Sequence, residues 1–297
     1  MHAEVAGSQL PDLTAQGRDL PLDSHLHTDL SPDSNVPIDA YANQAVERGI
    51  AEIAITDHVD FEPGAPAFDF VPFALRERTV RDAAEHWGPR GVAIRFGVEI
   101  TYDQRYEAAM RDHLARNRYD YVIGSVHVYQ DSPYHASRVA AWVAGRPLQE
   151  VIAPYFDEVG RAIRSGLFDT IGHLDFVKRY LHPHVTAADL AAAPELYEPL
   201  LVALVETGMA LEVNTSGLRQ AAGETYPSAA VVDRYKVLGG TMVSAGSDAH
   251  TKESFSSGLE EAYRVAAAAG FRDLAFRRGG DRVAVALPDR YGTPAQT

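Results

Sequence analysis

Short apolar segments alternate with longer stretches of helical periodicity along most of this chain. Apolar runs of four to eight residues predict seven strands, over 22–27, 52–56, 93–99, 119–127, 170–173, 210–214 and 241–248. Apolar residues at helical spacing predict helices over 38–48, 103–117, 135–144, 148–165, 187–207, 228–238, 257–269 and 271–277, and one ending at Trp87 after a loop over 59–69. Such alternation is typical of a parallel sheet covered by helices.

The seven strand–helix units show no linker or internal repeat between them, so they predict one α/β domain over residues 21–297. A final apolar segment spans 283–287, and residues 1–20 form a polar N-terminal extension. Seven units favour a closed or nearly closed barrel. An open doubly wound sheet is the structural alternative, but its usual glycine-rich phosphate loop is missing after the first strand.

Composition narrows the function classes. The formal net charge of −14 over 297 residues disfavours nucleic acid or an anionic membrane surface as a partner. The sequence contains no cysteine, so a metal would have to be held by imidazole and carboxylate groups. No apolar run approaches the roughly 20 residues of a membrane span, and the first residues do not read as a signal peptide. We therefore expect a cytoplasmic protein.

The chemically informative residues lie at the predicted strand ends. His25 and His27 close the first strand, and residues two apart on a strand point to the same side. As an isolated pair they are equally well explained as surface histidines. The later strand ends, however, carry the same kinds of side chain, namely His58, Glu99, His127, His173, Asn214, Asp248 and His250.

Each of these residues also has a structural explanation. A histidine after a strand is often a hydrogen-bonded turn residue, Glu99 suits a helix start, and Asp248 suits a helix N-cap. Together these explanations fail, because the loops after barrel strands converge on one face. Eight imidazoles and carboxylates would then meet there with nothing to neutralise or orient them. The pattern predicts a multinuclear metal site. His182 and His184 lie near a strand end and remain candidate substrate contacts.

These motifs resemble the PHP (polymerase and histidinol phosphatase) metallohydrolase family, across residues 23–250. The resemblance rests on His25-Leu26-His27-Thr28 with Asp33, Thr56-Asp57-His58, Gly97-Val98-Glu99, Gly124-Ser125-Val126-His127, Gly172-His173-Leu174-Asp175 and Gly246-Ser247-Asp248-Ala249-His250. The segment 211–219, Leu-Glu-Val-Asn-Thr-Ser-Gly-Leu-Arg, is similar to the histidinol-phosphatase branch.

The resemblance implies a distorted (β/α)7, TIM-like barrel with three divalent metal ions. It assigns the first ion to His25, His27, Glu99 and Asp248. It assigns the second to Glu99, His127 and His173, with Glu99 bridging, and the third to Asp33, His58 and His250. Zinc, manganese and iron all suit such nitrogen and oxygen ligands.

The implied activity is a metal-dependent phosphomonoesterase that acts on a small phosphorylated substrate, L-histidinol phosphate, in histidine biosynthesis. Asp248 or His250 would assist proton transfer, and Arg179 and Arg219 are candidate phosphate contacts because a guanidinium can fork onto phosphate oxygens. Three alternatives stay open. The first is a PHP phosphoesterase that acts on another ester, such as a nucleotide or a phosphoprotein. The second is an amidohydrolase-type two-metal hydrolase, and the third is a non-catalytic PHP module.

Overall fold

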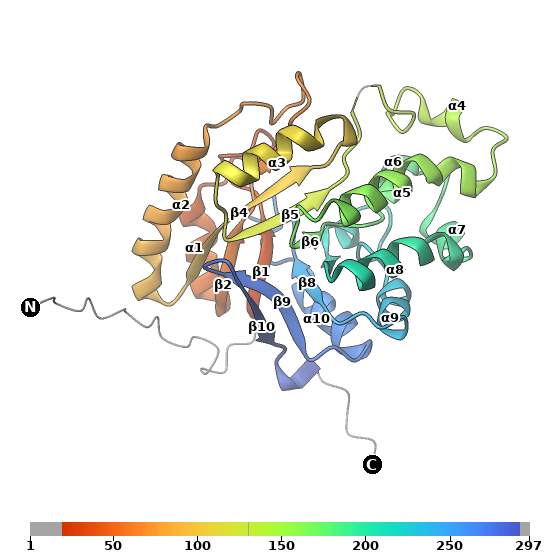
Figure 1. Ribbon diagram of the computed structural model, residues 1–297. Coiled ribbons are helices and arrows are strands. Elements are labelled where there is room, and N and C mark those ends of the chain that lie inside the picture. Colours follow the sequence, from red (N-terminus) through yellow and green to blue (C-terminus); the bar gives the residue numbers. More distant parts are fainter. Residues whose placement is uncertain (1–19, 130, 292–297) are drawn as a thin grey trace, which may run out of the picture.

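The structure, a computed structural model, describes residues 20–129 and 131–291. Seven parallel strands form the central sheet in the order β1-β2-β4-β5-β6-β7-β8 (Figure 1). These strands are β1 (Leu20–Leu26), β2 (Ile50–Ile55), β4 (Ala93–Thr101), β5 (Tyr121–Ser125), β6 (Thr170–Ile171), β7 (Ala210–Asn214) and β8 (Val243–Gly246). A two-residue strand, β3 (His58–Val59), pairs beside β4. Spatial order therefore follows chain order, as in a β/α barrel.

The first and last strands of the sheet meet at a seam. Leu26 forms a parallel bridge with Ala249, just beyond β8. The backbone N–H of His27 donates to the carbonyl of Ala249 at 3.0 Å, and the N–H of Asp248 donates to the carbonyl of His25 at 2.8 Å. These bonds curl the sheet into a nearly closed barrel, and the expected distorted (β/α)7 fold is confirmed.

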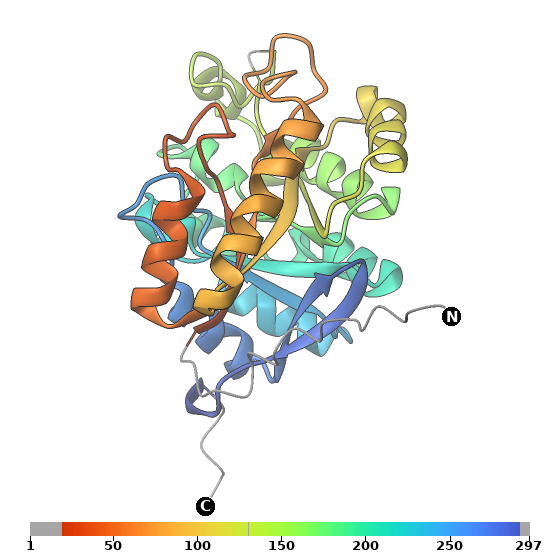
Figure 2. The same ribbon diagram turned by 90° about the vertical axis from the view of Figure 1, so that its left-hand side faces the viewer.

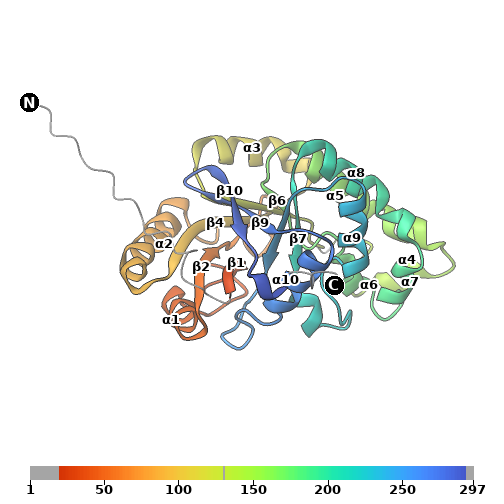
Figure 3. The ribbon, with the colours of Figure 1, turned by 90° about the horizontal axis from the view of Figure 1, so that it is seen from below.

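Helices cover the outside of the barrel (Figures 1 and 3). They are α1 (Ile38–Arg48), α2 (Phe73–Trp87), α3 (Glu107–Arg116), α4 (Val139–Val143), α5 (Leu148–Ser165), α6 (Val177–Leu181), α7 (Ala187–Ala191), α8 (Glu198–Thr207), α9 (Ala229–Val237) and α10 (Leu259–Ala268). Pro37 and Pro147 stand just before α1 and α5, where a fixed φ favours a helix start. Gly49 and Gly166 end these helices in the left-handed conformation that glycine adopts without strain. None of the helices in the described ranges is long and apolar enough to cross a bilayer.

The single long helix expected over 187–207 is wrong. The chain instead forms α7, a 3-10 turn over Pro194–Leu196, and α8. Pro194 and Pro199 explain the breaks, because proline lacks the N–H that a helix interior needs and fits only in a first turn. The Ala- and Leu-rich composition hid two helix starts.

The helix expected over 271–277 is also wrong. Residues in that range form β9 (Asp273–Arg278), which pairs antiparallel with β10 (Asp281–Ala286). Leu274 and Phe276 alternate inward, and the Phe276 ring lies 4.8 Å from the ring of Tyr121 at the start of β5. The hairpin therefore lies across the N-terminal ends of the barrel strands, as Figures 2 and 3 show. The predicted extension over 1–20 falls outside the described residues except for Leu20, which begins β1.

Candidate metal centre

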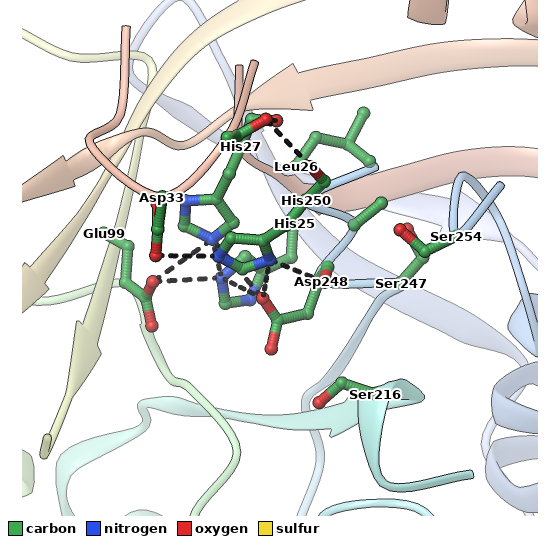
Figure 4. Close-up of polar contacts among 12 residues, drawn as sticks. His25, Leu26, His27, Asp33, Glu99, Ser216, Ser247, Asp248, His250 and Ser254 are labelled. Atoms are coloured by element: carbon green, nitrogen blue, oxygen red, sulfur yellow. Dashed lines mark hydrogen bonds and ion pairs between the residues drawn. The ribbon is translucent and has the colours of Figure 1, made fainter. Parts of the chain in front are cut away.

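A cavity of about 830 Å³ opens at the carboxyl ends of the barrel strands. The predicted ligand residues lie together at its base and walls, although they come from six separate segments of the chain. Figure 4 shows six of them, namely His25, His27, Asp33, Glu99, Asp248 and His250. The nine residues are His25, His27, Asp33, His58, Glu99, His127, His173, Asp248 and His250. His25 and His27 are fully buried beneath it, and the other seven line it.

The β1 end contributes the deepest ligand group. His25 and His27 point to the same side, as expected for a strand, and their Nε2 atoms are 3.0 Å apart. The Oδ1 atom of Asp248 lies 3.4 Å from His27 Nε2 and 3.8 Å from His25 Nε2. Asp248 has a φ of 53°, in the left-handed region that aspartate enters more readily than most residues other than glycine. The hydrogen bond across the barrel seam, from the Asp248 N–H to the His25 carbonyl, holds the Asp248 backbone beside the β1 end.

Glu99 lies at the middle of the cluster. Its Oε2 atom is 3.3 Å from the Nε2 atoms of both His25 and His27. Its Oε1 atom faces the other way, 2.9 Å from His173 Nε2 and 3.6 Å from His127 Nε2. One carboxylate therefore joins two groups of imidazoles, as a bridging ligand would.

A third group lies toward the cavity mouth. Asp33 Oδ2 is 3.2 Å from His58 Nε2 and 3.1 Å from His250 Nε2. His58 stands opposite Glu99 in the β3–β4 register, and its Nδ1 atom is 3.0 Å from Glu99 Oε2. This short strand, which the sequence did not predict, therefore joins the outer group to the central carboxylate.

Glu212 belongs to the same cluster and was missed as a site residue. It is fully buried on β7, and its Oε1 atom lies 2.6 Å from His25 Nδ1. Its Oε2 atom accepts a hydrogen bond from the His173 backbone N–H at 2.8 Å. Asn214 donates from Nδ2 to Glu212 Oε2 at 3.1 Å and to Asp248 Oδ2 at 3.3 Å. The sequence does offer one signal for this role, because a glutamate inside the apolar run 210–214 is expected to be buried and to need a polar partner.

Opposite charges set the proton affinities of the cluster. Burial alone would lower the pKa of His25, but the carboxylates of Glu212 and Glu99 outweigh it and raise that pKa well above its usual value. Burial, together with His250 and His58, lowers the pKa of His27 to about 3. Burial opposes ionisation of Glu99, yet the surrounding imidazoles, His25 first, hold its pKa well below the ordinary range. Glu99 and His27 thus have the ionised and neutral forms that bind metals, whereas His25 would release a proton when a metal binds.

Two observations test whether divalent cations fit these residues. Glu99 Oε2 is buried and accepts no well-aligned hydrogen bond among the described residues, although three imidazole nitrogens, from His25, His27 and His58, lie within 3.3 Å of it. The Nε2 atoms of His25 and His27 also lie 3.0 Å apart and both face Glu99 Oε2 and Asp248 Oδ1, so a cation among them would meet two imidazoles and two carboxylates. The imidazole and carboxylate set suits zinc, manganese or iron. We conclude that the residues fit a metal cluster.

The predicted substrate contacts differ in their placement. Arg179 and Arg219 both line the cavity. Arg219 already donates to the carbonyl oxygens of Ser247, at 2.7 Å, and Ser257, at 3.2 Å, so it also holds the loop after β8. The phosphate-binding roles of both arginines stay predictions. His182 and His184 are exposed and are not among the residues that line the cavity.

The fold and the site define an α/β-barrel protein with a cluster of imidazoles and carboxylates, suited to metal binding, at the carboxyl ends of its strands. A PHP domain model matches residues 23–216. The chain belongs to the PHP domain family, as its motifs indicated.

Relatives of known name cover most of the chain. It is 31% identical over 254 residues to a probable histidinol-phosphatase of Thermotoga maritima, spanning 86% of this chain and 94% of that protein. The histidinol-phosphatase of Lactococcus lactis is 27% identical over 263 residues, 86% of this chain and 93% of the relative. The crystal structure of histidinol phosphate phosphatase from Lactococcus lactis, complexed with zinc, L-histidinol and phosphate, superposes with a TM-score of 0.77. That likeness covers 89% of this chain and 98% of the other at 23% identity, and supports the fold.

Proposed function

We propose that this protein is a metal-dependent phosphomonoesterase that hydrolyses L-histidinol phosphate to L-histidinol and phosphate. The observation that carries the proposal is the cluster around Glu99, whose two oxygens face separate imidazole groups at the base of an open cavity. The names of the relatives, histidinol-phosphatase and probable histidinol-phosphatase, support the choice of L-histidinol phosphate as the substrate. We also propose a role in histidine biosynthesis and a cytoplasmic location, which this substrate supports.

The three groups of side chains correspond to three proposed divalent metal sites. His25, His27, Glu99 and Asp248 would hold the first ion, and Glu99, His127 and His173 the second. Asp33, His58 and His250 would hold the third. When bound, such ions supply a water nucleophile at neutral pH and neutralise charge on the phosphoryl group.

The chain's own residues position that chemistry. Asp248 and His250 both line the cavity, and their side chains lie 3.5 Å apart, from Oδ1 to Nδ1. We assign them the proton transfer to the departing alkoxide, because they combine access to the cavity with carboxylate and imidazole chemistry.

Arg179 and Phe176 form the proposed substrate-facing wall. The Arg179 guanidinium lies 5.3 Å from the Phe176 ring centroid, and no carboxylate within the described ranges pairs with it. An unpaired guanidinium in the wall of a cavity is suited to a phosphate oxygen. The Phe176 ring offers an apolar surface beside it for the organic part of the substrate.

The amidohydrolase-type alternative lacks its central residue here. That class uses a bridging carbamylated lysine, whereas Glu99 occupies the centre of this cluster. Lys178 instead binds Asp175 and Glu224, at 2.6 and 2.5 Å. The bridging position therefore favours phosphoester hydrolysis.

A substrate screen with metal analysis tests the proposal. Purified, metal-loaded protein is assayed for phosphate release from L-histidinol phosphate, nucleotides and a phosphopeptide, and its bound metal is measured on the same sample. We expect the fastest release from L-histidinol phosphate. Clear release from another ester with none from L-histidinol phosphate would overturn the substrate assignment, and metal binding with no release at all would indicate a non-catalytic module.

A further inference from the structure

A second polar hollow lies at the end of the barrel opposite the metal cluster. It has a volume of about 570 Å³ and forms where four segments meet. These segments are α2, the end of α3 through the start of β5, the loop before β6, and the β9–β10 hairpin around its turn at Gly279 and Gly280. None of the nine metal-ligand candidates lines this hollow.

The lining of this hollow is positively charged. Four arginines line it, one each from α2, the segment after α3, β9 and β10, namely Arg81, Arg118, Arg277 and Arg282. The only carboxylates among the lining residues of the described chain are Asp120 and Asp169. The hollow therefore carries an excess of two positive charges in a molecule whose formal net charge is −14. Such a local reversal of sign concentrates anions from solution.

Two of the arginines have a structural partner. Arg81 Nη1 lies 2.5 Å from Asp120 Oδ2, and Arg81 Nη2 lies 3.0 Å from Asp120 Oδ1, which is a forked pair. Arg277 contacts Asp169 and donates to the Gly280 carbonyl at 2.5 Å. These bonds fasten α2 and the hairpin to the starts of β5 and β6, and they neutralise both carboxylates.

The other two arginines lack such a partner. In residues 20–129 and 131–291, neither Arg118 nor Arg282 forms an ion pair within 4.0 Å, although the charge of Arg282 acts on Asp169 and opposes the rise in the pKa of that carboxyl that burial causes. The hydrogen-bond contact of Arg282 is to the Met242 sulfur, 3.7 Å from Nη1, and a thioether is a weak acceptor. Direct ion pairs thus account for Arg81 and Arg277, whereas the guanidinium groups of Arg118 and Arg282 form no direct ion pair in the described residues.

We propose that this hollow binds a compact phosphoryl dianion between Arg118 and Arg282. The dianion matches the excess of two positive charges, and a guanidinium offers parallel N–H donors to phosphate oxygens. Free phosphate and a small phosphate monoester share this chemistry. The site is separate from the metal centre and does not rest on the proposed function.

Calorimetric titration of the full-length, metal-loaded protein with inorganic phosphate tests this site. We expect a binding component that Arg118→Ala/Arg282→Ala weakens at least tenfold while metal content stays unchanged. The matched control Arg78→Ala/Arg146→Ala removes two exposed arginines that do not line the hollow, and should keep the component. The single variant Arg118→Ala, at an exposed position after a helix, should weaken the component if the double variant folds poorly.

A parallel titration with 2-aminoethylphosphonate, a non-hydrolysable mimic of a small ester, separates the two sources. Tighter binding of inorganic phosphate assigns the site to the free ion, and tighter binding of the phosphonate assigns it to an ester. Equal losses in the two double variants would mean a diffuse charge effect and would overturn the site. Phosphate binding that neither Arg118→Ala nor the double variant changes would overturn it as well.

Discussion

Glu212→Gln is the sharpest test of how the barrel positions its proposed metal ligands. The Glu212 carboxylate makes two contacts, with His25 Nδ1 at 2.6 Å and with the His173 N–H at 2.8 Å. The first fixes the His25 proton on Nδ1 and leaves Nε2 free to bind a metal. Glutamine keeps the size of the side chain but has one acceptor oxygen. If that oxygen accepts from His25, the amide N–H₂ of glutamine faces the His173 N–H, and two donors oppose each other.

The expected magnitudes follow from these two contacts. A buried N–H left without an acceptor costs about 1–3 kcal/mol of folding free energy. Loss of a residue that orients a metal-binding histidine typically lowers metal affinity by about 10–100-fold. We expect Glu212→Gln to show both effects, because Glu212 touches the first and second proposed metal groups at once.

Two measurements separate these effects. Metal affinity is measured by competition with a chelator, and the free energy of unfolding is measured by urea titration of the metal-free protein. Glu52→Gln is the matched control, since Glu52 is also a buried strand glutamate but pairs with Arg95 and Arg278 at the far end of the barrel. The control should lose stability and keep metal affinity. Wild-type metal affinity in Glu212→Gln would refute the positioning role.

Three further changes have definite expected outcomes. Glu99→Gln should abolish phosphate release and lower bound metal with the far-ultraviolet circular dichroism unchanged, and retained turnover would contradict a bridging role. Gly246→Ala would place a Cβ 2.3 Å from the Cβ of His25, so overpacking should cost about 1–3 kcal/mol in urea titrations and a wild-type midpoint would contradict the packing. Burial, with Arg116 and Arg76, lowers the pKa of His113 below its usual 6.5, so the unfolded chain takes up its proton first as pH falls. Stability should therefore decrease below about pH 6.5, and His113→Gln should remove part of that decrease in unfolding titrations at pH 7.5 and 5.5; identical pH slopes would contradict it.

The sequence predicted the seven barrel strands because buried parallel strands are short, nearly continuous apolar runs. It also predicted which residues gather at the cavity, since loops after parallel strands share one end of the barrel. The pairing of ligands was not predictable from spacing alone. Which imidazoles Glu99 Oε1 and Oε2 face depends on strand tilt and on the short strand at His58, and neither leaves a periodic signal.

The wrong predictions have physical causes of their own. Helical composition over 187–207 outweighed Pro194 and Pro199, which restart the helix rather than kink it. The β9 segment is too short for the spacing of its apolar residues to distinguish a strand from a helix. Its conformation depends on pairing with β10 and on packing against the N-terminal ends of the barrel strands. Glu212 was overlooked because a buried carboxylate on a strand shows its role only once its neighbours from β1 and β6 are in place.

The barrel seam has a consequence for how the protein is made. The first proposed ligand group needs His25 from the first strand and Asp248 from just beyond the last, and backbone bonds across the seam align them. During synthesis the N-terminal ligands emerge long before their partner, so a nascent chain holds an incomplete set until nearly the whole barrel has left the ribosome. Closing so distant a contact is an entropically late step in folding. Full metal loading therefore reports that the barrel has closed.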